Sequence, residues 1–234
     1  MFLRALLILA FSVSVAGCRP NAPVPDKVID DARRRAVEII RMSDYDPIGS
    51  GFLLNERGMI LTCEHILRLY IDPRRNRERR VIVRMGGMEA PASLVHADPN
   101  VDLALLRWEA PVEMRGSLRK MDDLLAAEVR WAPRRDVRVG QPALLVGSPY
   151  GLTESVLVGS IAHTNRINTD NDYREVPFIQ TSGMSYPGSS GAAVFIGDGR
   201  IIGINRATWG WSPGTGIGLV VPSGVVREFL ASVR

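Results

Sequence analysis

The chain has 234 residues, 46% of them hydrophobic, which is enough for one domain with a substantial core or for two small subdomains in contact. Its 22 glycines and 15 prolines, with few long helical patterns, favour an all-β fold with many turns. The net charge of +4 rests almost entirely on arginine, and no recognisable nucleic-acid module accompanies it, so we expect no nucleic-acid partner.

The first residues have the pattern of a processing segment. An early arginine is followed by an apolar run from Ala5 to about Ala16, which has the length of a signal-peptide core and is short for a membrane span. The ending "VAGC" resembles a bacterial lipobox, in which the cysteine is acylated. We therefore predict a lipoprotein signal peptide over 1–17, a lipid on Cys18 and a Pro-rich tether over 18–27. The alternative is an ordinary signal peptide with an incidental cysteine.

The cysteine count indicates how the domain is held together. The chain has two cysteines, so a lipid on Cys18 leaves Cys63 without an intramolecular partner. We expect a domain without a disulfide, despite an extracytoplasmic location, that depends on its core for stability.

Residues 28–234 are predicted to form the folded domain. Helical patterns occur at 27–35 and 222–233, and between them lie short apolar segments separated by turns. About a dozen strands at this spacing indicate a sandwich or a pair of barrels. The expected strands are 36–42, 50–54, 59–62, 81–85, 90–96, 102–107, 142–147, 155–164, 176–181, 192–196, 200–207 and 216–221.

The segments between these strands are also partly interpretable. "NERG" at 55–58 and "GDGR" at 197–200 are predicted hairpin turns, with glycine at a position suited to positive φ. The polar stretch 108–136, with a possible helix in "RKMDDLLAAE", is expected to connect two halves of the domain. We interpret the arginine-rich "DPRRNRERR" at 72–80 as a solvated loop rather than a site for an anionic partner.

The stretch "YPGSSGAAVF" contains two adjacent serines that are candidate nucleophiles. No histidine follows Ser190, which excludes the Ser, acid, His order of α/β-hydrolases. The string "SLRK" matches S-x-x-K, but no lysine follows it to complete a Ser-Lys site. Cys63 and His65 are close, but no second pair of ligands has a zinc-like spacing, so we expect no metal and no cofactor.

The order that remains is His, Asp, Ser. His65, in "GMILTCEHIL", falls at a predicted junction of a strand and a helical turn, and Asp102 opens the apolar strand "DLALLR". A carboxylate at the mouth of a buried strand is costly unless it is hydrogen-bonded, and orienting a histidine through its Nδ1–H meets that need. Taken singly, His65 is equally explained as a packed structural histidine and Asp102 as a turn cap.

Three motifs in register resemble one family. "GSGFLLNERGMILTCEHIL", "DPNVDLALLR" and "FIQTSGMSYPGSSGAAVF" with "GRIIGIN" are similar to the histidine, aspartate and serine regions of trypsin-like proteases of the HtrA/Deg type, over about 36–232. The resemblance implies an all-β fold of two antiparallel six-stranded β-barrels with a C-terminal helix. The first barrel is expected at about 36–107, the connection at 108–136, the second barrel at about 137–221 and the terminal helix at 222–233. The chain ends just after that helix, so we expect a protease domain without a PDZ domain.

The resemblance also implies a role for each site residue. His65 is general base and then acid, Asp102 orients it, and an oxyanion hole uses the backbone N–H groups of the nucleophile and of the residue two before it. If Ser189 were the nucleophile, the second donor would be Pro187, which has no N–H. The hole therefore selects Ser190, with Gly188 as the second donor.

Substrate binding is less readable. In a trypsin-like register Met184 lies at the base of the specificity pocket, and the absence of an acidic residue there predicts a small or medium apolar P1 side chain. The strand of Arg206, Ala207 and Thr208 is expected to pair with the substrate backbone by strand addition.

We therefore predict a serine endopeptidase that cleaves proteins or peptides in the bacterial cell envelope, is anchored to a membrane through Cys18, and faces the periplasm or exterior. Whether it forms a homo-oligomer stays open. Arg206 falls where a small polar residue commonly supports the catalytic Asp, and an arginine there is placed to pair with Asp102 and weaken its hold on His65. Glu64, next to His65, is a second departure from the family pattern. The alternative is thus a catalytically weak, protease-like binding or scaffold lipoprotein.

Overall fold

The computed structural model describes residues 24–55, 57–70, 74, 80–109, 129–208 and 216–233. The predicted signal peptide with Cys18, the possible helix at 119–128 and most of the arginine-rich stretch lie outside the described residues. Within the described ranges, no helix is both long enough and apolar enough to cross a membrane.

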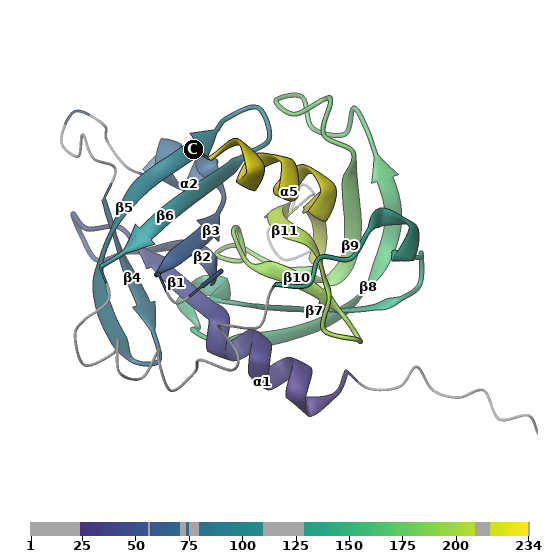
Figure 1. The fold of residues 1–234 in the computed structure, drawn as a ribbon, viewed down its shortest axis with the longest axis horizontal. Helices are drawn as coiled ribbons and strands as arrows, with labels where there is room; N and C mark the ends of the chain where they lie inside the picture. Colours follow the sequence, from purple (N-terminus) through teal and green to yellow (C-terminus); the bar gives the residue numbers. More distant parts are fainter. Residues whose placement is uncertain are drawn as a thin grey trace, which may run out of the picture.

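Two closed antiparallel barrels of six strands each lie side by side, as predicted (Figure 1). The strand order is β1-β2-β3-β6-β5-β4 around the first barrel and β7-β8-β9-β12-β11-β10 around the second, so both barrels have the same connectivity. The first barrel consists of β1 Ala36–Ile40, β2 Pro47–Leu53, β3 Met59–Thr62, β4 Val81–Met85, β5 Met88–Asp98 and β6 Leu103–Trp108. The second consists of β7 Pro142–Gly147, β8 Ser155–Arg166, β9 Phe178–Ser185, β10 Ala193–Ile196, β11 Ile201–Thr208 and β12 Gly216–Pro222.

The strand predictions are confirmed in kind and differ mainly in length. β2 begins at Pro47 rather than at residue 50, because Pro47 continues the pairing with β1 across an irregular register at Ile40. β9 runs on to Ser185 because it pairs there with Gly216 of β12. Both predicted hairpin turns have a glycine with positive φ, at Gly58 and Gly199.

The barrel interiors explain why the strands read as apolar runs. All the residues of β10 are buried, as are nearly all of β3 and β6. One apolar cluster fills the second barrel, and a larger one fills the first barrel and continues into the interface. There the Phe52 ring of β2 meets the Phe195 ring of β10 edge to face, with centroids 5.8 Å apart. The barrels are therefore joined by core packing as well as by the chain.

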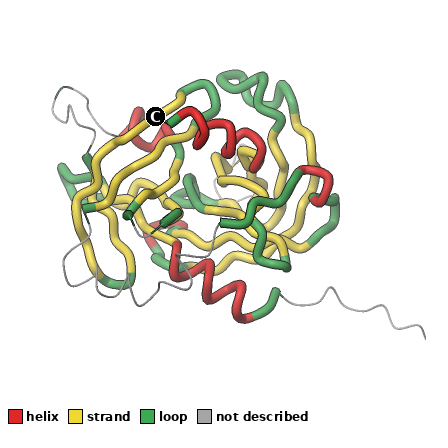
Figure 2. The backbone as a smooth tube through the Cα atoms, in the orientation of Figure 1, coloured by secondary structure: helices red, strands yellow, loops and turns green. Residues whose placement is uncertain are grey.

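The helices, drawn red in Figure 2, lie on the outside of the two barrels. The described helices are α1 Asp26–Arg35, α2 Glu64–Tyr70 and α5 Ser223–Ser232, and the 3-10 turns are η1 Arg134–Asp136 and η2 Pro149–Gly151. The terminal helix was predicted at 222–233. It packs on β11 and β12 and also reaches the first barrel, where Phe229 stacks on His96 of β5 at 5.2 Å. At the other end of the chain, Arg33 of α1 pairs with Glu154 of the second barrel at 3.1 Å.

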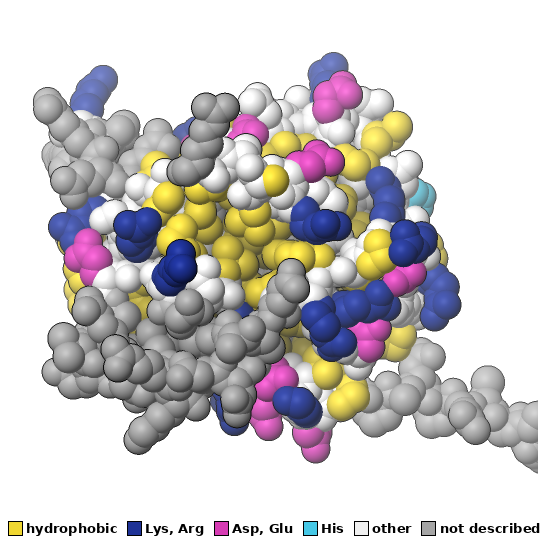
Figure 3. All heavy atoms as spheres, in the orientation of Figure 1, with side chains coloured by type: hydrophobic (Ala, Val, Ile, Leu, Met, Phe, Trp, Pro, Cys, Tyr) yellow, Lys and Arg dark blue, Asp and Glu magenta, His cyan; other side chains and the backbone are white. Residues whose placement is uncertain are grey.

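Charges on the face shown in Figure 3 are mixed, with lysine and arginine side chains spread among acidic ones. Elsewhere in the described structure, Arg41 pairs with Asp44 and Asp46, and Arg80 pairs with Glu109. Exposed pairs of this kind contribute only about 0–1 kcal/mol each, so the folded state depends on the apolar clusters.

The Phe52–Phe195 contact yields a prediction about barrel docking. In a double-mutant cycle with Phe52→Leu and Phe195→Leu, we expect a coupling of about 1 kcal/mol in the free energy of unfolding, because an edge-to-face aromatic pair exceeds its area burial by roughly that amount. Urea denaturation measures it. The control cycle combines Phe52→Leu with Phe229→Leu, whose ring stacks on His96 instead. Equal coupling in both cycles would contradict a specific contact between the barrels.

Candidate active site

A cleft of about 350 Å³ lies where the two barrels meet. Its wall from the first barrel includes Ile48 and the residues of α2 that face the second barrel. Its wall from the second barrel includes the loop between β9 and β10 and Arg206 of β11. The lining residues are Ile48, His65, Arg68, Leu69, Asp172, Tyr186, Pro187, Gly188, Ser190 and Arg206.

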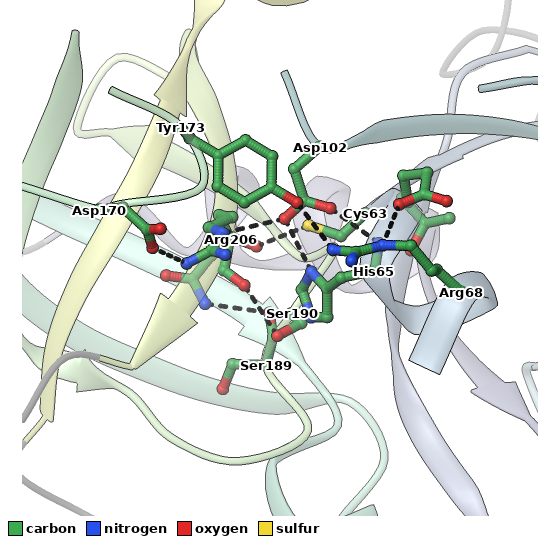
Figure 4. Close-up of polar contacts among 12 residues, drawn as sticks. Cys63, His65, Arg68, Asp102, Asp170, Tyr173, Ser189, Ser190 and Arg206 are labelled. Atoms are coloured by element: carbon green, nitrogen blue, oxygen red, sulfur yellow. Dashed lines mark hydrogen bonds and ion pairs between the residues drawn. The ribbon is translucent and has the colours of Figure 1, made fainter. Parts of the chain in front are cut away.

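His65 is fixed by its position at the start of α2, just after β3 ends at Thr62. Its backbone N–H donates to Asp102 Oδ1 at 2.7 Å, and its ring Nδ1 lies 2.7 Å from Asp102 Oδ2 (Figure 4). An ionised carboxylate only accepts hydrogen bonds, so Nδ1 is the donor and Nε2 is the basic nitrogen of the ring. Its side chain is 13% exposed. Asp102 therefore orients the imidazole through Nδ1, and the ring stays partly exposed to the cleft.

Asp102 is completely buried, in the turn directly before β6, with a φ of 57°. Three donors reach its carboxylate. Two come from His65, and the third is Nε of Arg206, 3.0 Å from Oδ2. A buried carboxylate is tolerated when it is paired and hydrogen-bonded, and this one is matched on both oxygens.

Ser190 lies in the loop between β9 and β10, on the far side of the cleft from Asp102. Its hydroxyl donates to the backbone carbonyl of Arg206 at 2.9 Å, and within the described residues no hydrogen bond joins it to His65. The Ser190 carbonyl accepts the N–H of Ser50 at 2.8 Å, which connects the loop between β9 and β10 to β2 of the first barrel. The neighbouring Ser189 is fully buried, and its hydroxyl accepts the N–H of Tyr186 at 3.3 Å. Of the two serines, only Ser190 lines the cleft.

The backbone before Ser190 is held in one orientation. The N–H of Tyr150, in η2, donates to the carbonyl of Pro187 at 2.8 Å. In a trans peptide the C=O and the following N–H point in opposite directions, so this bond turns the N–H of Gly188 away from η2. Neither that N–H nor the N–H of Ser190 donates to any described residue. Both N–H groups are therefore without a hydrogen-bond partner among the described residues, next to the Ser190 hydroxyl.

Gly188 cannot be replaced without moving this loop. Its φ is 89°, and a Cβ there would lie 2.5 Å from the carbonyl oxygen of Ser148. The Gly188 carbonyl accepts the hydroxyl of Ser50 at 2.7 Å, and the same hydroxyl oxygen accepts the N–H of Ser148 at 2.8 Å. The Ser50 hydroxyl thus connects the first barrel, the start of η2 and the loop between β9 and β10.

The residues expected to bind substrate fall in two places. Arg206 lines the cleft, and the backbone of Ala207 and Thr208 continues β11 opposite Leu219 and Gly218 of β12. Met184 is fully buried in the apolar cluster of the second barrel, and its thioether lies close to Gly159.

The sequence did not predict several residues that surround the site. Asp170 and Tyr173, from the loop between β8 and β9, contact the Arg206 guanidinium. Ser50 makes two hydrogen bonds to the loop between β9 and β10, and Tyr150 makes one. No local pattern marks these residues, because each acts on a partner far away in the chain. In this loop the sequence pointed only to Gly188, two residues before Ser190, and to Pro187.

Glu64, which departs from the family pattern next to His65, has a defined partner. The structure places its carboxylate against Arg68 Nε at 3.1 Å, one helical turn further along α2, with only 3% of the residue exposed. Arg68 also donates to the hydroxyl of Tyr173 at 3.2 Å. Glu64 is thus engaged by a positive charge beside the imidazole.

Cys63, His65 and Asp102 also place one ligand atom each within 4.8 Å of one another. Their chemistry does not fit a metal site, because Asp102 Oδ2 already binds the Arg206 guanidinium and His65 Nδ1 already donates to Asp102. Burial raises the pKa of the Cys63 thiol well above its usual value, followed in importance by the nearby Asp102 charge, which opposes the thiolate that a metal needs. Cys63 is a free thiol, and its Sγ lies 3.4 Å from the Asn205 carbonyl oxygen.

The Ser50 bridge yields a stability prediction. Ser50→Ala leaves the Gly188 carbonyl and the Ser148 N–H without their partner, so we expect a loss of about 2 kcal/mol in the free energy of unfolding. Urea denaturation measures it. Ser155→Ala is the matched control, since it removes one exposed hydroxyl that donates to the Leu152 carbonyl. Equal losses in the two variants would show that the bridge has no special weight.

Comparison with known proteins agrees with this geometry. The chain matches a family model described as a trypsin-like peptidase domain over residues 49–204. It is 34% identical over 190 residues to a probable periplasmic serine endoprotease DegP-like of Marinomonas sp. (strain MWYL1), covering 80% of this chain and 35% of that relative. It is 32% identical over 201 residues to a protein with the same description from Brucella suis biovar 1 (strain 1330), covering 85% and 35%. The chain thus spans about a third of the length of these relatives.

A solved structure described as HtrA-type protease AlgW with tripeptide superposes with a TM-score of 0.71 and 26% identity, covering 89% of this chain and 62% of that one. The family model, the two barrels and the cleft between them lead to one assignment. The chain belongs to the trypsin-like peptidase family, and its homologues are serine endoproteases of the HtrA/DegP type.

Proposed function

We propose that this protein is a serine endopeptidase that hydrolyses peptide bonds with His65, Asp102 and Ser190. One observation carries the proposal: the His65 ring is bonded to the buried Asp102 at 2.7 Å and stands in the same cleft as Ser190 and Gly188. Nucleophilic catalysis needs a base, a carboxylate that orients the base and a serine hydroxyl in the same cleft.

In this proposal Ser190 Oγ attacks the carbonyl carbon of the scissile bond while His65 Nε2 takes its proton. Asp102 stabilises the imidazolium that forms. The same proton then passes from Nε2 to the leaving amine, and an acyl group remains on Ser190. Water, deprotonated by His65 Nε2, then attacks the acyl carbonyl carbon. The bond to Ser190 Oγ breaks, His65 returns the proton to that oxygen, and the second product leaves.

The negative charge of each tetrahedral intermediate falls on the former carbonyl oxygen. The N–H groups of Gly188 and Ser190 are its donors, and the Tyr150–Pro187 hydrogen bond supports their orientation before substrate arrives. Removing one such donor in serine proteases costs about 3 kcal/mol in the barrier, so a pre-oriented pair is a large part of the catalytic effect.

The resting hydroxyl of Ser190 donates to the Arg206 carbonyl, so catalysis includes a turn of that hydroxyl toward His65 Nε2. Catalytic hydrogen bonds often form fully only in the substrate complex. A peptide in the cleft supplies a reason for the turn, since an extended substrate beside β11 competes for the same Arg206 backbone group.

The substrates in this proposal are proteins or peptides that bind as an added strand along Arg206, Ala207 and Thr208. The pairing of β11 with β10 ends at Ile204, while β12 covers only its other edge, which leaves a backbone edge for the substrate. The P1 side chain is small or medium and apolar, in a pocket with Met184 at its base. The related structure of AlgW with a tripeptide supports peptide binding.

The proposed location is the bacterial cell envelope, facing the periplasm or exterior, with a lipid on Cys18 as the anchor. The relatives described as periplasmic support the compartment. The lipobox-like "VAGC" before the Pro-rich tether supports the anchor.

A second function, a protease-like binding or scaffold protein of weak activity, is favoured by one observation. Asp102 Oδ2 is shared between His65 and the Arg206 guanidinium, which competes for the charge that supports the imidazolium. A substrate edge and a cleft serve a binder equally well. Measured turnover separates the two functions.

The adjacent serines test the enzymatic function. Ser190→Ala is expected to abolish both casein cleavage and labelling by a fluorophosphonate probe, because it removes the nucleophile. Ser189→Ala removes a buried hydroxyl that does not line the cleft, so labelling is expected to stay within about tenfold of the parent protein. Absence of cleavage and labelling in the parent protein would favour the binding function, and labelling that survives Ser190→Ala would refute the assignment of the nucleophile.

The anchor has a separate test. Cys18→Ser is expected to move the protein from the membrane fraction to the soluble envelope fraction, because the acylated residue is lost. Immunoblotting of fractionated cells measures the distribution, and Cys63→Ser is the matched control. Membrane association that is unchanged in Cys18→Ser would rule out lipidation at this residue.

A further inference from the structure

We propose that Arg206, held by Asp170 and Tyr173, is a positioning residue that fixes the orientation and the net charge of the Asp102 carboxylate behind His65. This inference rests on the proposed peptidase function and adds to it a second layer of residues from the loop between β8 and β9. It also explains how an arginine can stand beside the orienting carboxylate without removing its charge.

The Arg206 guanidinium contacts two carboxylates and one aromatic ring. Its Nε donates to Asp102 Oδ2 at 3.0 Å, and its Nη1 is bonded to Asp170 Oδ2. The guanidinium carbon lies 4.4 Å from the centroid of the Tyr173 ring, which covers one face of the group (Figure 4). The side chain is only 13% exposed, and that of Asp170 is 11% exposed. Arg206 therefore has a fixed geometry and is not a mobile surface cation.

The electrostatics favour a permanent charge on Arg206. Burial lowers the pKa of the guanidinium, but the charges of Asp102 and then Asp170 outweigh burial and leave the pKa raised. Arg206 stays positive wherever a histidine titrates. The group of Asp102, Arg206 and Asp170 thus carries a net charge of about −1, the charge of a lone carboxylate.

Asp170 supplies the compensating charge, and its loop positions it. Asp170 Oδ1 accepts the N–H of Asp172 at 3.0 Å, and its carbonyl accepts the N–H of Tyr173 at 3.2 Å. The Tyr173 hydroxyl accepts from Arg68 on α2 at 3.2 Å. The loop is therefore bonded to both elements that carry the site, to β11 through Arg206 and to α2 through Arg68.

Variants change the charge of this group in opposite directions. Asp170→Asn brings it from −1 to 0, Arg206→Thr brings it to −2, and the double variant returns it to −1. Negative charge near the imidazole favours the protonated ring, so the pH at which His65 takes up its proton follows this charge. All three variants keep the other ionisable groups that surround the imidazole: Cys63, Glu64, Arg68, Asp172 and Tyr173.

The experiment measures this pH in two ways. The first is the acid limb of kcat/KM for a fluorogenic peptide, and the second is an NMR titration of the His65 ring nitrogens in the purified resting protein, with the signal assigned by its loss in His65→Gln. We expect Asp170→Asn to move the midpoint down by about one pH unit and Arg206→Thr to move it up by a similar amount. The double variant is expected within about 0.3 units of the parent protein, because its charge is restored.

The matched controls are Asp136→Asn and Arg200→Thr, which change the charge of a remote ion pair by the same amounts and are expected to shift neither midpoint. Arg206→Lys keeps the charge but loses the planar fork, so it should hold the midpoint while kcat falls about tenfold. If Arg206→Thr does not fold, Asp170→Asn and Arg206→Lys still decide the question.

Shifts of the same sign in both single variants, or no shift in folded variants, would overturn the proposal, since a structural role alone gives no opposed movement. The two proposals also fail separately. A parent protein without turnover or probe labelling refutes the peptidase function, whereas the NMR titration of the same protein still tests the role of Arg206.

Discussion

The fully buried carboxylate of Asp102 is the constraint around which the site is built. An unpaired charge in that place would cost several kcal/mol, so its donors are a condition of folding and not an addition to it. Two of them belong to His65 in the first barrel, and the third, from Arg206, belongs to the second. Docking of the barrels therefore adds the third donor to Asp102, a positively charged one that the first barrel does not supply.

Ser190 is placed by the same interface, through hydrogen bonds to the backbone of its loop. Ser50 of the first barrel donates its N–H to the Ser190 carbonyl and its hydroxyl to the Gly188 carbonyl. Tyr150 fixes the peptide between Pro187 and Gly188 from the other side. These bonds are 2.7–2.8 Å long, so the distance from His65 to Ser190 is set by the register of the two barrels against each other.

Much of this arrangement was predictable because it follows from local patterns. Short apolar runs between glycine-containing turns indicated the strands, and the need to satisfy a carboxylate at the start of an apolar strand indicated the pairing of Asp102 with His65. The missing N–H of the proline before Gly188 favoured Ser190 over Ser189, and of the two only Ser190 lines the cleft. These inferences use residues whose meaning depends on their immediate neighbours in the chain.

The parts that were missed depend on contacts across long separations. Asp170 and Arg206 are 36 residues apart, and Arg206 and Asp102 are 104 apart, so no periodicity or motif connects them. With respect to Asp102, Arg206 was predicted only to compete with His65, because no pattern in the sequence indicated that Asp170 compensates its charge. The structure also shows that β9 is longer than its apolar pattern, since pairing with β12 and not hydropathy ends it.

The division of the site between two barrels has a consequence for the order in which the site is assembled during synthesis. The chain emerges from its N-terminus, and domains form as their sequence becomes available. His65 and Asp102 appear with the first barrel, whereas Ser190 and Arg206 come from the final quarter of the chain. A nascent chain whose second barrel is not yet closed therefore holds the His65–Asp102 pair without Ser190 and Arg206, and the site is complete only when the last strands are in place.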